Sequence, residues 1–184
     1  MKIITAKKLS NNLRPDLYYS AFWKIDFDKL QQMGINNLII DVDSTIAHTD
    51  SNEVEIKAAD ALFAALSKGF KVCLVSNTIT GKRKEKRVAK MAEQFNIPYV
   101  AANFFNRKPN SKPFLKGLSF MKAQPEHTAV IGDQIFTDVL GGNRMGMTTI
   151  LVKPLGPVHW TTVFLLRRYR EMRILKKFKI ELCD

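Results

Sequence analysis

The stretch LIIDVDSTIAHTD, residues 38–50, decides the fold. Its apolar beginning, residues 38–42 with one interruption, predicts a buried strand, and two aspartates, Asp41 and Asp43, stand where that strand surfaces. A hydroxyl residue, Thr45, follows two positions later. Two carboxylates this close repel each other unless a cation lies between them. The stretch therefore predicts either a helix cap or an acidic functional site at the end of a strand.

The rest of the chain alternates between two kinds of segment. Short apolar, β-rich segments predict strands at residues 38–42, 71–75, 98–101, 128–131 and 148–152. Helical spacing predicts helices between them, at residues 52–69, 82–96, 112–125 and 134–146. Strands that alternate with helices of this length predict βαβ units and a parallel sheet with helices on both faces. We therefore expect a three-layer α/β fold.

Size and composition are those of one folded domain. The chain has 184 residues, of which 46% are hydrophobic, and this is sufficient for a core. We expect one domain over residues 1–184, with a core at about 20–157 and a basic tail at about 158–184. We find neither an apolar stretch of ~18 residues nor a signal peptide. Cys73 and Cys183 form no metal-type spacing and no disulfide framework, so we expect a cytoplasmic protein.

The chain is strongly basic. Twenty-nine Lys and Arg against seventeen Asp and Glu give a net charge of +12, which favours a polyanionic neighbour such as nucleic acid or an anionic membrane. Residues 81–90 contain six basic residues and one acid, and residues 151–184 contain eight and three. A solvated helix face would explain either run equally simply.

Residues 160–180 predict a helix with two different sides. The apolar side carries Phe164, Leu165, Tyr169, Met172 and Leu175. The basic side carries Arg167, Arg170, Arg173 and Lys177, while Arg168, Lys176 and Lys179 lie near the apolar edge. Such a helix either lies in an anionic membrane interface or packs its apolar side on the core.

Polar residues follow four of the predicted strands. They are Asp41 and Asp43, then Ser76 and Asn77, then RKPNSK at 107–112, and finally GDQIFTD at 132–138. An aspartate after one strand is usually a helix cap, but four polar groups in this order are hard to explain by capping. The carboxyl ends of parallel strands meet at one edge of the sheet, so we expect one shared site.

The motifs DVDST, LVSNT, RKP and GDQIFTD resemble, in order and separation, the four motifs of haloacid dehalogenase-type (HAD) phosphatases. The chain is most similar to the compact subfamily IIIA that includes the bacterial YqeG family, which is similar to mitochondrial phosphatidylglycerophosphate phosphatases. The likeness runs from about Leu13 into the basic tail and is most specific at residues 132–154. It implies a HAD-like, Rossmannoid sheet. The intervals after Thr45 and after Asn77 are too short for a cap domain.

The resemblance implies a role for each acid. Asp41 would attack phosphorus and become an aspartyl phosphate, and Asp43 would act as general acid and then general base. Mg²⁺ would be held by the Asp41 carboxylate, the Asp43 main-chain carbonyl and Asp133. Asp138 would order metal-bound water or the motif lysine. Haloacid dehalogenases lack the second aspartate, so Asp43 favours a phosphatase.

The resemblance also assigns the phosphate-binding groups. Ser76 and Asn77 would hydrogen-bond the phosphoryl oxygens, and Lys108 would pair with the phosphate and with Asp41. Lys112 is an alternative, because a proline follows it too. Thr45 and Gly132 would support the site. Ser44 departs from the family, which usually has Asn or Gly at this turn.

The leading hypothesis is an Mg²⁺-dependent phosphomonoesterase that acts through an aspartyl phosphate on a lipid phosphate such as phosphatidylglycerophosphate. A phosphatase of a soluble sugar or nucleotide phosphate is one alternative, and a basic nucleic-acid- or ribosome-associated module is another. Four aspartates in one site would repel nucleic-acid phosphates, which argues against the module. We expect a cytoplasmic protein with peripheral contact to the inner face of an anionic membrane.

Overall fold

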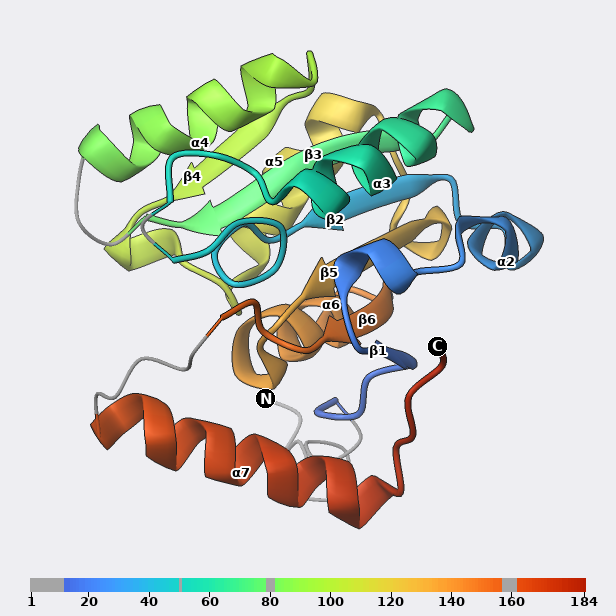
Figure 1. Cartoon of the computed structure of the whole chain (residues 1–184), viewed down its shortest axis with the longest axis vertical. Helices are drawn as coiled ribbons and strands as arrows, with labels where there is room; N and C mark the ends of the chain where they lie inside the picture. Colours follow the sequence, from blue (N-terminus) through green and yellow to red (C-terminus); the bar gives the residue numbers. More distant parts are fainter. Residues whose placement is uncertain (1–11, 50, 79–81, 157–161) are drawn as a thin grey trace, which may run out of the picture.

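A parallel sheet forms the centre of the computed structural model, which describes residues 12–49, 51–78, 82–156 and 162–184. Its strand order is β1-β6-β5-β2-β3-β4, and every described pairing is parallel (Figure 1). The strands are β1 (Leu17–Tyr19), β2 (Asn37–Ile40), β3 (Lys71–Asn77), β4 (Tyr99–Ala102), β5 (Thr128–Gly132) and β6 (Thr148–Val152). The predicted fold class and its five strands are confirmed. The edge strand β1 was missed, because three residues carry too little periodicity to detect.

Helices cover both faces of this sheet. On one face, η1 (Phe22–Lys24), α2 (Phe27–Gln32), α3 (Ile56–Ser67) and α4 (Lys82–Gln94) share a large apolar cluster with Leu38 and Ile40 of β2. On the other face, Ile39 packs in a second cluster with Phe114 of α5 (Ser111–Met121). Successive strand residues point to opposite faces, which is why one strand feeds both clusters.

The segment predicted as one helix at residues 134–146 is divided in two. It begins with a π-helical turn, η4 (Ile135–Val139), and continues as the short helix α6 (Leu140–Arg144). Two shorter 3₁₀ turns, η2 (Phe104–Asn106) and η3 (Pro125–His127), occur elsewhere. Between β2 and α3, and between β3 and α5, the described residues form loops, α4, β4 and η2, with no inserted cap domain among them.

Strand β2 lies at the point where the chain direction across the sheet reverses. The next strand in sequence, β3, lies on one side of it and β5 lies on the other. The Asp41 N–H still donates to the Ile131 carbonyl at 2.9 Å, so the backbone ladder continues as far as Asp41. Ligands of open parallel sheets bind at such switch points, beyond the carboxyl ends of the strands.

The tail forms helix α7 (Thr162–Phe178), which lies beside the core near β1 and β6 (Figure 1). Ile174 and Leu175 pack against a small apolar cluster of η4 and β6 residues. Only part of the expected apolar side packs on the core: Tyr169 and Met172 are 57% and 54% exposed, whereas Glu171 is buried. Polar contacts, described below, set the orientation of the helix. The expected boundary at residues 157–158 and the side chains of residues 162–165 lie outside the description.

Candidate active site

The polar strand ends meet around one cavity of about 510 Å³. Its lining comes from every predicted motif and from two helices: Asp41, Asp43, Thr49, Ser76, Asn77, Lys84, Arg107, Lys108, Pro109, Gln134, Phe136, Thr137 and Arg167. The structure thus brings together residues that are far apart in the sequence: Asp41 and Arg167 are separated by 126 positions. They converge because parallel strands end at the same edge.

Lys108 occupies the centre of the acidic cluster. Its Nζ lies 2.5 Å from Asp41 Oδ1 and 2.7 Å from Asp138 Oδ1, and it donates to the Val75 carbonyl at 2.8 Å. Lys108 is 3% exposed, whereas Lys112 is exposed near the start of α5. Of the two candidate lysines, Lys108 is therefore the one that reaches Asp41.

Asn77 holds the backbone of Lys108. Its Oδ1 accepts from the Lys108 N–H at 2.8 Å, and its Nδ2 donates to the Lys108 carbonyl at 3.3 Å. The expected contact from Asn77 to a phosphoryl oxygen would compete with this bridge between β3 and the lysine loop. Ser76 is buried and lines the cavity.

Thr45 and Ser44 shape the turn after Asp41. Thr45 is fully buried, and its hydroxyl donates to Asp41 Oδ2 at 3.4 Å. Ser44 has a φ of 60°, in the left-handed region that Gly and Asn adopt most readily. This conformation explains the Asn or Gly expected in the family at this turn. Here the Ser44 hydroxyl lies 3.0 Å from that of Thr49.

Asp133 and Asp138 complete the cluster from the end of β5. Carboxylate oxygens of Asp41, Asp133 and Asp138 lie within 4.8 Å of one another. Asp138 Oδ2 accepts from the Thr137 hydroxyl at 3.0 Å and from the Gln134 N–H at 3.3 Å. A methyl group at Gly132 would overlap the Asp138 carboxyl group, so glycine leaves room for that side chain.

The electrostatics of this cluster fit a divalent cation. Burial raises the pKa of Asp41 to about 8, with Lys108 lowering it and the neighbouring carboxylates raising it. Burial likewise raises the pKa of Asp133 to about 7, against the lowering effect of Arg168. Burial alone would lower the pKa of Lys108, but Asp138 and Asp41 raise it above its usual range. Asp133 Oδ1 is buried without a hydrogen-bond partner among the described residues. Clustered carboxylate oxygens with an unpaired atom suit Mg²⁺.

Helix α4 contributes an arginine that the sequence did not single out. Arg87 is buried, and its Nη1 lies 2.6 Å from Asp43 Oδ1. The guanidinium also donates to the carbonyls of His48, at 3.1 Å, and Ser51. The basic run at residues 81–90 is thus not a uniformly solvated face. Its spacing did carry a signal, since residue 87 lies one helical turn before the apolar Met91.

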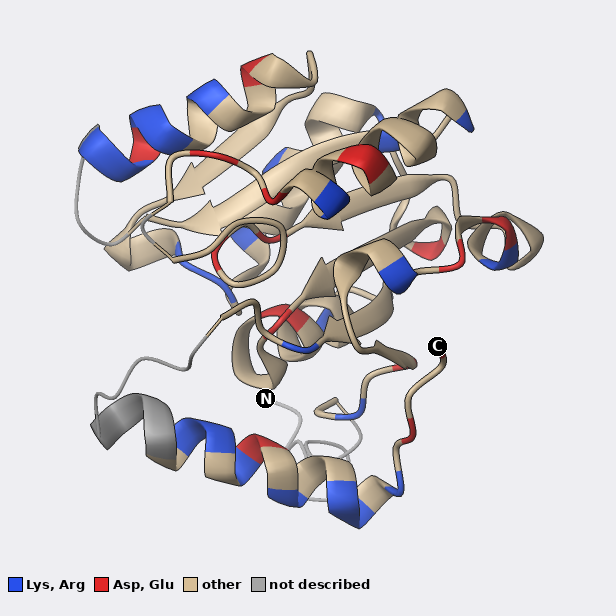
Figure 2. Cartoon of the chain, viewed as in Figure 1, with Lys and Arg blue, Asp and Glu red and all other residues tan. Residues whose placement is uncertain are grey.

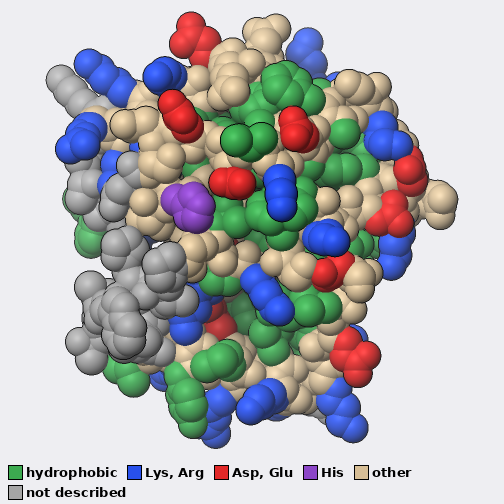
Figure 3. All heavy atoms as spheres, viewed as in Figure 1, with side chains coloured by type: hydrophobic (Ala, Val, Ile, Leu, Met, Phe, Trp, Pro, Cys, Tyr) green, Lys and Arg blue, Asp and Glu red, His purple; other side chains and the backbone are tan. Residues whose placement is uncertain are grey.

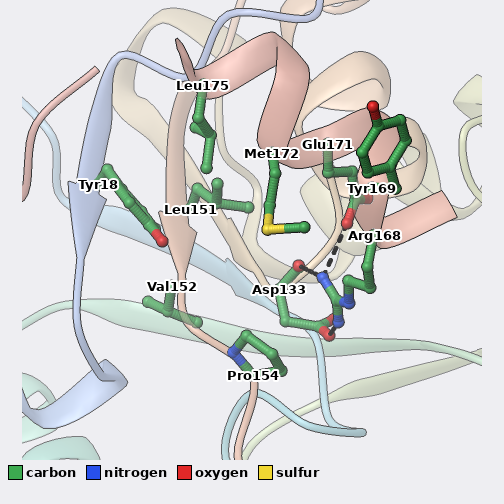
Figure 4. A pocket seen from close by; sticks show the side chains of 10 residues that line it. All are labelled: Tyr18, Asp133, Leu151, Val152, Pro154, Arg168, Tyr169, Glu171, Met172 and Leu175. Atoms are coloured by element: carbon green, nitrogen blue, oxygen red, sulfur yellow. Dashed lines mark hydrogen bonds and ion pairs between the residues drawn. The ribbon is translucent and has the colours of Figure 1, made fainter. Parts of the chain in front are cut away.

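Helix α7 contributes two further arginines from the basic tail. Arg168 binds Asp133 and Glu171, whereas Arg167 lines the cavity and lies over the Phe136 ring at 5.9 Å. A second, mostly apolar cavity of about 350 Å³ separates α7 from β1 and β6 next to Asp133 (Figure 4). The position of Arg168 near the apolar edge of the helix was a signal that it could face the core, whereas nothing in the local sequence distinguishes Arg167 from Arg170 and Arg173.

Known proteins resemble this chain in sequence and in fold. Residues 2–156 match the family described as mitochondrial PGP phosphatase. The Bacillus subtilis protein named probable phosphatase YqeG is 34% identical over 90% of this chain and 91% of its own length. Phosphatidylglycerophosphate phosphatase 1 of Chlamydomonas reinhardtii chloroplasts is 28% identical over 71% of this chain and 49% of its own length. A crystal structure described as a HAD-like phosphatase from Mesorhizobium loti superposes with a TM-score of 0.52, at 16% identity, over 78% of this chain and 87% of that one.

Proposed function

The chain belongs to the mitochondrial PGP phosphatase family and is a HAD-type phosphatase, and we propose that it is a metal-dependent phosphomonoesterase whose nucleophile is Asp41. Membership confirms the resemblance drawn from the motifs. One observation carries the proposed mechanism: Lys108 lies between Asp41 and Asp138 at the carboxyl edge of the sheet, beside Asp133. This arrangement combines a nucleophile, a cation for the phosphoryl charge and ligands for a metal.

In the first step, an Asp41 carboxylate oxygen attacks phosphorus as the bond from phosphorus to the ester oxygen breaks. Asp43 gives its proton to the departing alkoxide. The Asp43 side chain is 25% exposed, so it can meet a leaving group that enters from the cavity. Lys108, fixed by Asn77, neutralises charge on the phosphoryl oxygens, and Ser76 donates a hydrogen bond to one of them.

In the second step, Asp43 removes a proton from a water molecule that attacks phosphorus. The bond from phosphorus to Asp41 breaks, which releases phosphate and restores both aspartates to their starting states. When bound, Mg²⁺ would neutralise phosphoryl charge and orient the ester. The Asp41 and Asp133 carboxylates and the Asp43 carbonyl would hold it, with Asp138 in support.

The substrate that we favour is a lipid phosphate such as phosphatidylglycerophosphate. Three features support it: the family, the basic residues Arg107 and Arg167 at the cavity, and the exposed surface of α7. The exposed apolar residues of α7 are Leu166, Tyr169 and Met172, and basic residues lie between them along the helix. Figure 3 shows apolar and basic side chains side by side at the α7 end of the molecule. Apolar and basic side chains together suit an anionic membrane interface.

The same surface supports a peripheral location on the inner face of a membrane. No helix in the described ranges has the length and apolarity required to cross a bilayer. We also propose that residues 1–184 form one domain, since α7 packs on the core through Ile174 and Leu175. A soluble sugar or nucleotide phosphate is the alternative substrate. Because the chain is a phosphatase, the alternative of a nucleic-acid- or ribosome-associated module is supported mainly by the net charge of +12.

A phosphate-release screen tests the proposal. Phosphatidylglycerophosphate in mixed micelles, soluble sugar phosphates and nucleotides are offered with Mg²⁺ and with EDTA, and Asp41→Asn is the matched inactive control. We expect metal-dependent release that is highest with the lipid. Equal release by Asp41→Asn would contradict the nucleophile, and release confined to soluble esters would select the alternative substrate class.

A further inference from the structure

Arg168 of α7 holds one candidate metal ligand at two points. Its Nη1 donates to the Asp133 main-chain carbonyl at 2.6 Å, and its Nη2 donates to Asp133 Oδ2 (Figure 4). The Asp133 side chain is completely buried, and that of Arg168 is 16% exposed. A single guanidinium thus restrains both the backbone and the carboxylate of Asp133.

Glu171 fixes Arg168 in turn. Its Oε2 accepts from Arg168 Nη1 at 2.9 Å, one helical turn along α7. Its Oε1 accepts from the Ile135 N–H at 2.9 Å, in the π-helical turn that follows Asp133. Glu171 is 4% exposed. Because the nearby cavity leaves α7 loosely packed on β1 and β6, these polar contacts orient the helix at this point.

The contact allows two opposite roles for Arg168. The guanidinium either occupies the place of a cation at Asp133 or shares Asp133 with it. The two carboxylate oxygens favour sharing, because Arg168 binds Oδ2 while Oδ1 is buried without a hydrogen-bond partner in the described structure. Oδ1 therefore stays available as a metal ligand while Arg168 is in place.

The charges also favour sharing. The cluster joined by these ion pairs contains four carboxylates and two cations whose side chains are at most 16% exposed: Asp41, Asp133, Asp138, Glu171, Lys108 and Arg168. When all are ionised, a charge of −2 remains, which one divalent cation balances. Glu171 compensates Arg168 and so removes the repulsion that the guanidinium would exert on a metal. Arg167 is not counted in this charge, because it is 28% exposed and lies 3.8 Å from Glu171, so solvent screens its charge more strongly.

We propose that Arg168 and Glu171 are positioning residues of the metal site, and that α7 completes this site from beyond the matched family region of residues 2–156. Arg168 holds Asp133 so that Oδ1 remains available to the metal, and Glu171 keeps Arg168 in place without excess positive charge. The inference rests on the proposed metal-dependent function.

Metal binding without turnover tests this role. Mn²⁺ is titrated into the full-length protein by calorimetry, and free Mn²⁺ is counted by electron paramagnetic resonance. We compare Arg168→Gln with Arg170→Gln, a matched control on the exposed side of the same helix. Because partners of metal ligands contribute about 10- to 100-fold to affinity, Arg168→Gln should weaken Mn²⁺ binding by about that factor. Arg170→Gln should bind as the wild type does.

The sign of the change separates the two roles. Unchanged affinity in Arg168→Gln would overturn the inference, and tighter binding would show that the guanidinium competes with the metal. If wild-type protein binds no Mn²⁺, the metal-dependent function itself fails. If the wild type binds and the variant is unaltered, only the role of α7 fails.

Two more variants guard against a general loss of structure. Arg168→Lys keeps the charge but cannot make all three contacts, so it should recover part of the affinity. Glu171→Gln keeps the shape and should also weaken binding. Because both residues act through Asp133, the double variant should bind no more weakly than Arg168→Gln alone. Additive losses, with unchanged thermal unfolding, would overturn the coupling.

Discussion

Helices α4 and α7 are the two most basic of the described helices (Figure 2). Each of them directs an arginine to an aspartate of the site. Arg87 of α4 binds Asp43, and Arg168 of α7 binds Asp133. The two arginines have different partners: main-chain carbonyls complete the contacts of Arg87, whereas Glu171 on its own helix compensates Arg168. A run of basic residues can therefore contain one arginine that faces the site, and the two arginines contact different aspartates.

The helices also differ in what anchors them. Val88, Met91, Ala92 and Phe95 fix α4 in the main apolar cluster, while Ile174 and Leu175 connect α7 to a small one. The position of Arg87 thus follows from core packing. The position of Arg168 depends on the polar contacts that it makes itself, which makes the α7 contact easier to break.

The largest expected effect on phosphate release comes from a change at Asp41. Asp43 and Asp133, the two aspartates that bind arginines, would act together with this nucleophile. Asp41→Asn should lower phosphate release on the order of 10⁴-fold, because an amide cannot act as the nucleophile. Steady-state release with the exposed Asp60→Asn as control measures this. If Asp41→Asn releases phosphate at nearly the wild-type rate, Asp41 is not the nucleophile, and the catalytic roles inferred for Arg87 and Arg168 fail with it.

The next effect contrasts the two anchors. Met91→Ala should lower the free energy of unfolding by ~2–5 kcal/mol, because it opens a cavity in the main core. Leu175→Ala should cost ~1 kcal/mol, since that side chain is only partly buried. Urea denaturation of both variants compares them. Equal losses would mean that α7 is anchored as firmly as α4.

A third measurement separates the tasks of the two arginines. Arg87→Gln should lower kcat by ~10- to 100-fold, because Asp43 loses the group that orients it. Its Mn²⁺ affinity should remain that of the wild type, in contrast to Arg168→Gln. Loss of metal affinity in Arg87→Gln would erase the distinction between the two helices.

The smallest effect concerns the outer face of α7. Arg173→Gln should weaken association with anionic vesicles by ~1 kcal/mol, the contribution of one basic residue near such a surface. Its activity on a soluble ester should not change. Lys86→Gln on the exposed face of α4 is the control, and co-sedimentation at low salt is the measurement. Equal losses in both variants would indicate a diffuse charge effect rather than docking through α7.

Local patterns in the sequence predicted much of the fold and the site. Short apolar runs such as residues 128–131 favour strands, and the carboxyl ends of parallel strands meet at one edge of their sheet. That geometry is enough to bring Asp41, Ser76 and Asp133 to one edge of the sheet. The strand β1 escaped prediction because its pairing with β6 defines it, rather than any pattern of its own.

By itself, then, the sequence determined the α/β sheet and the acidic edge, because spacing along a strand or helix fixes which residues face inward and where each strand ends. Only the tertiary structure decided which of two lysines meets Asp41, that Asn77 holds the lysine loop, and that Arg87 and Arg168 turn inward. These contacts join residues 31 to 67 positions apart. Their formation depends on how the helices dock and on which carboxylates lie buried beneath them, and the spacing of charges within one helix specifies neither.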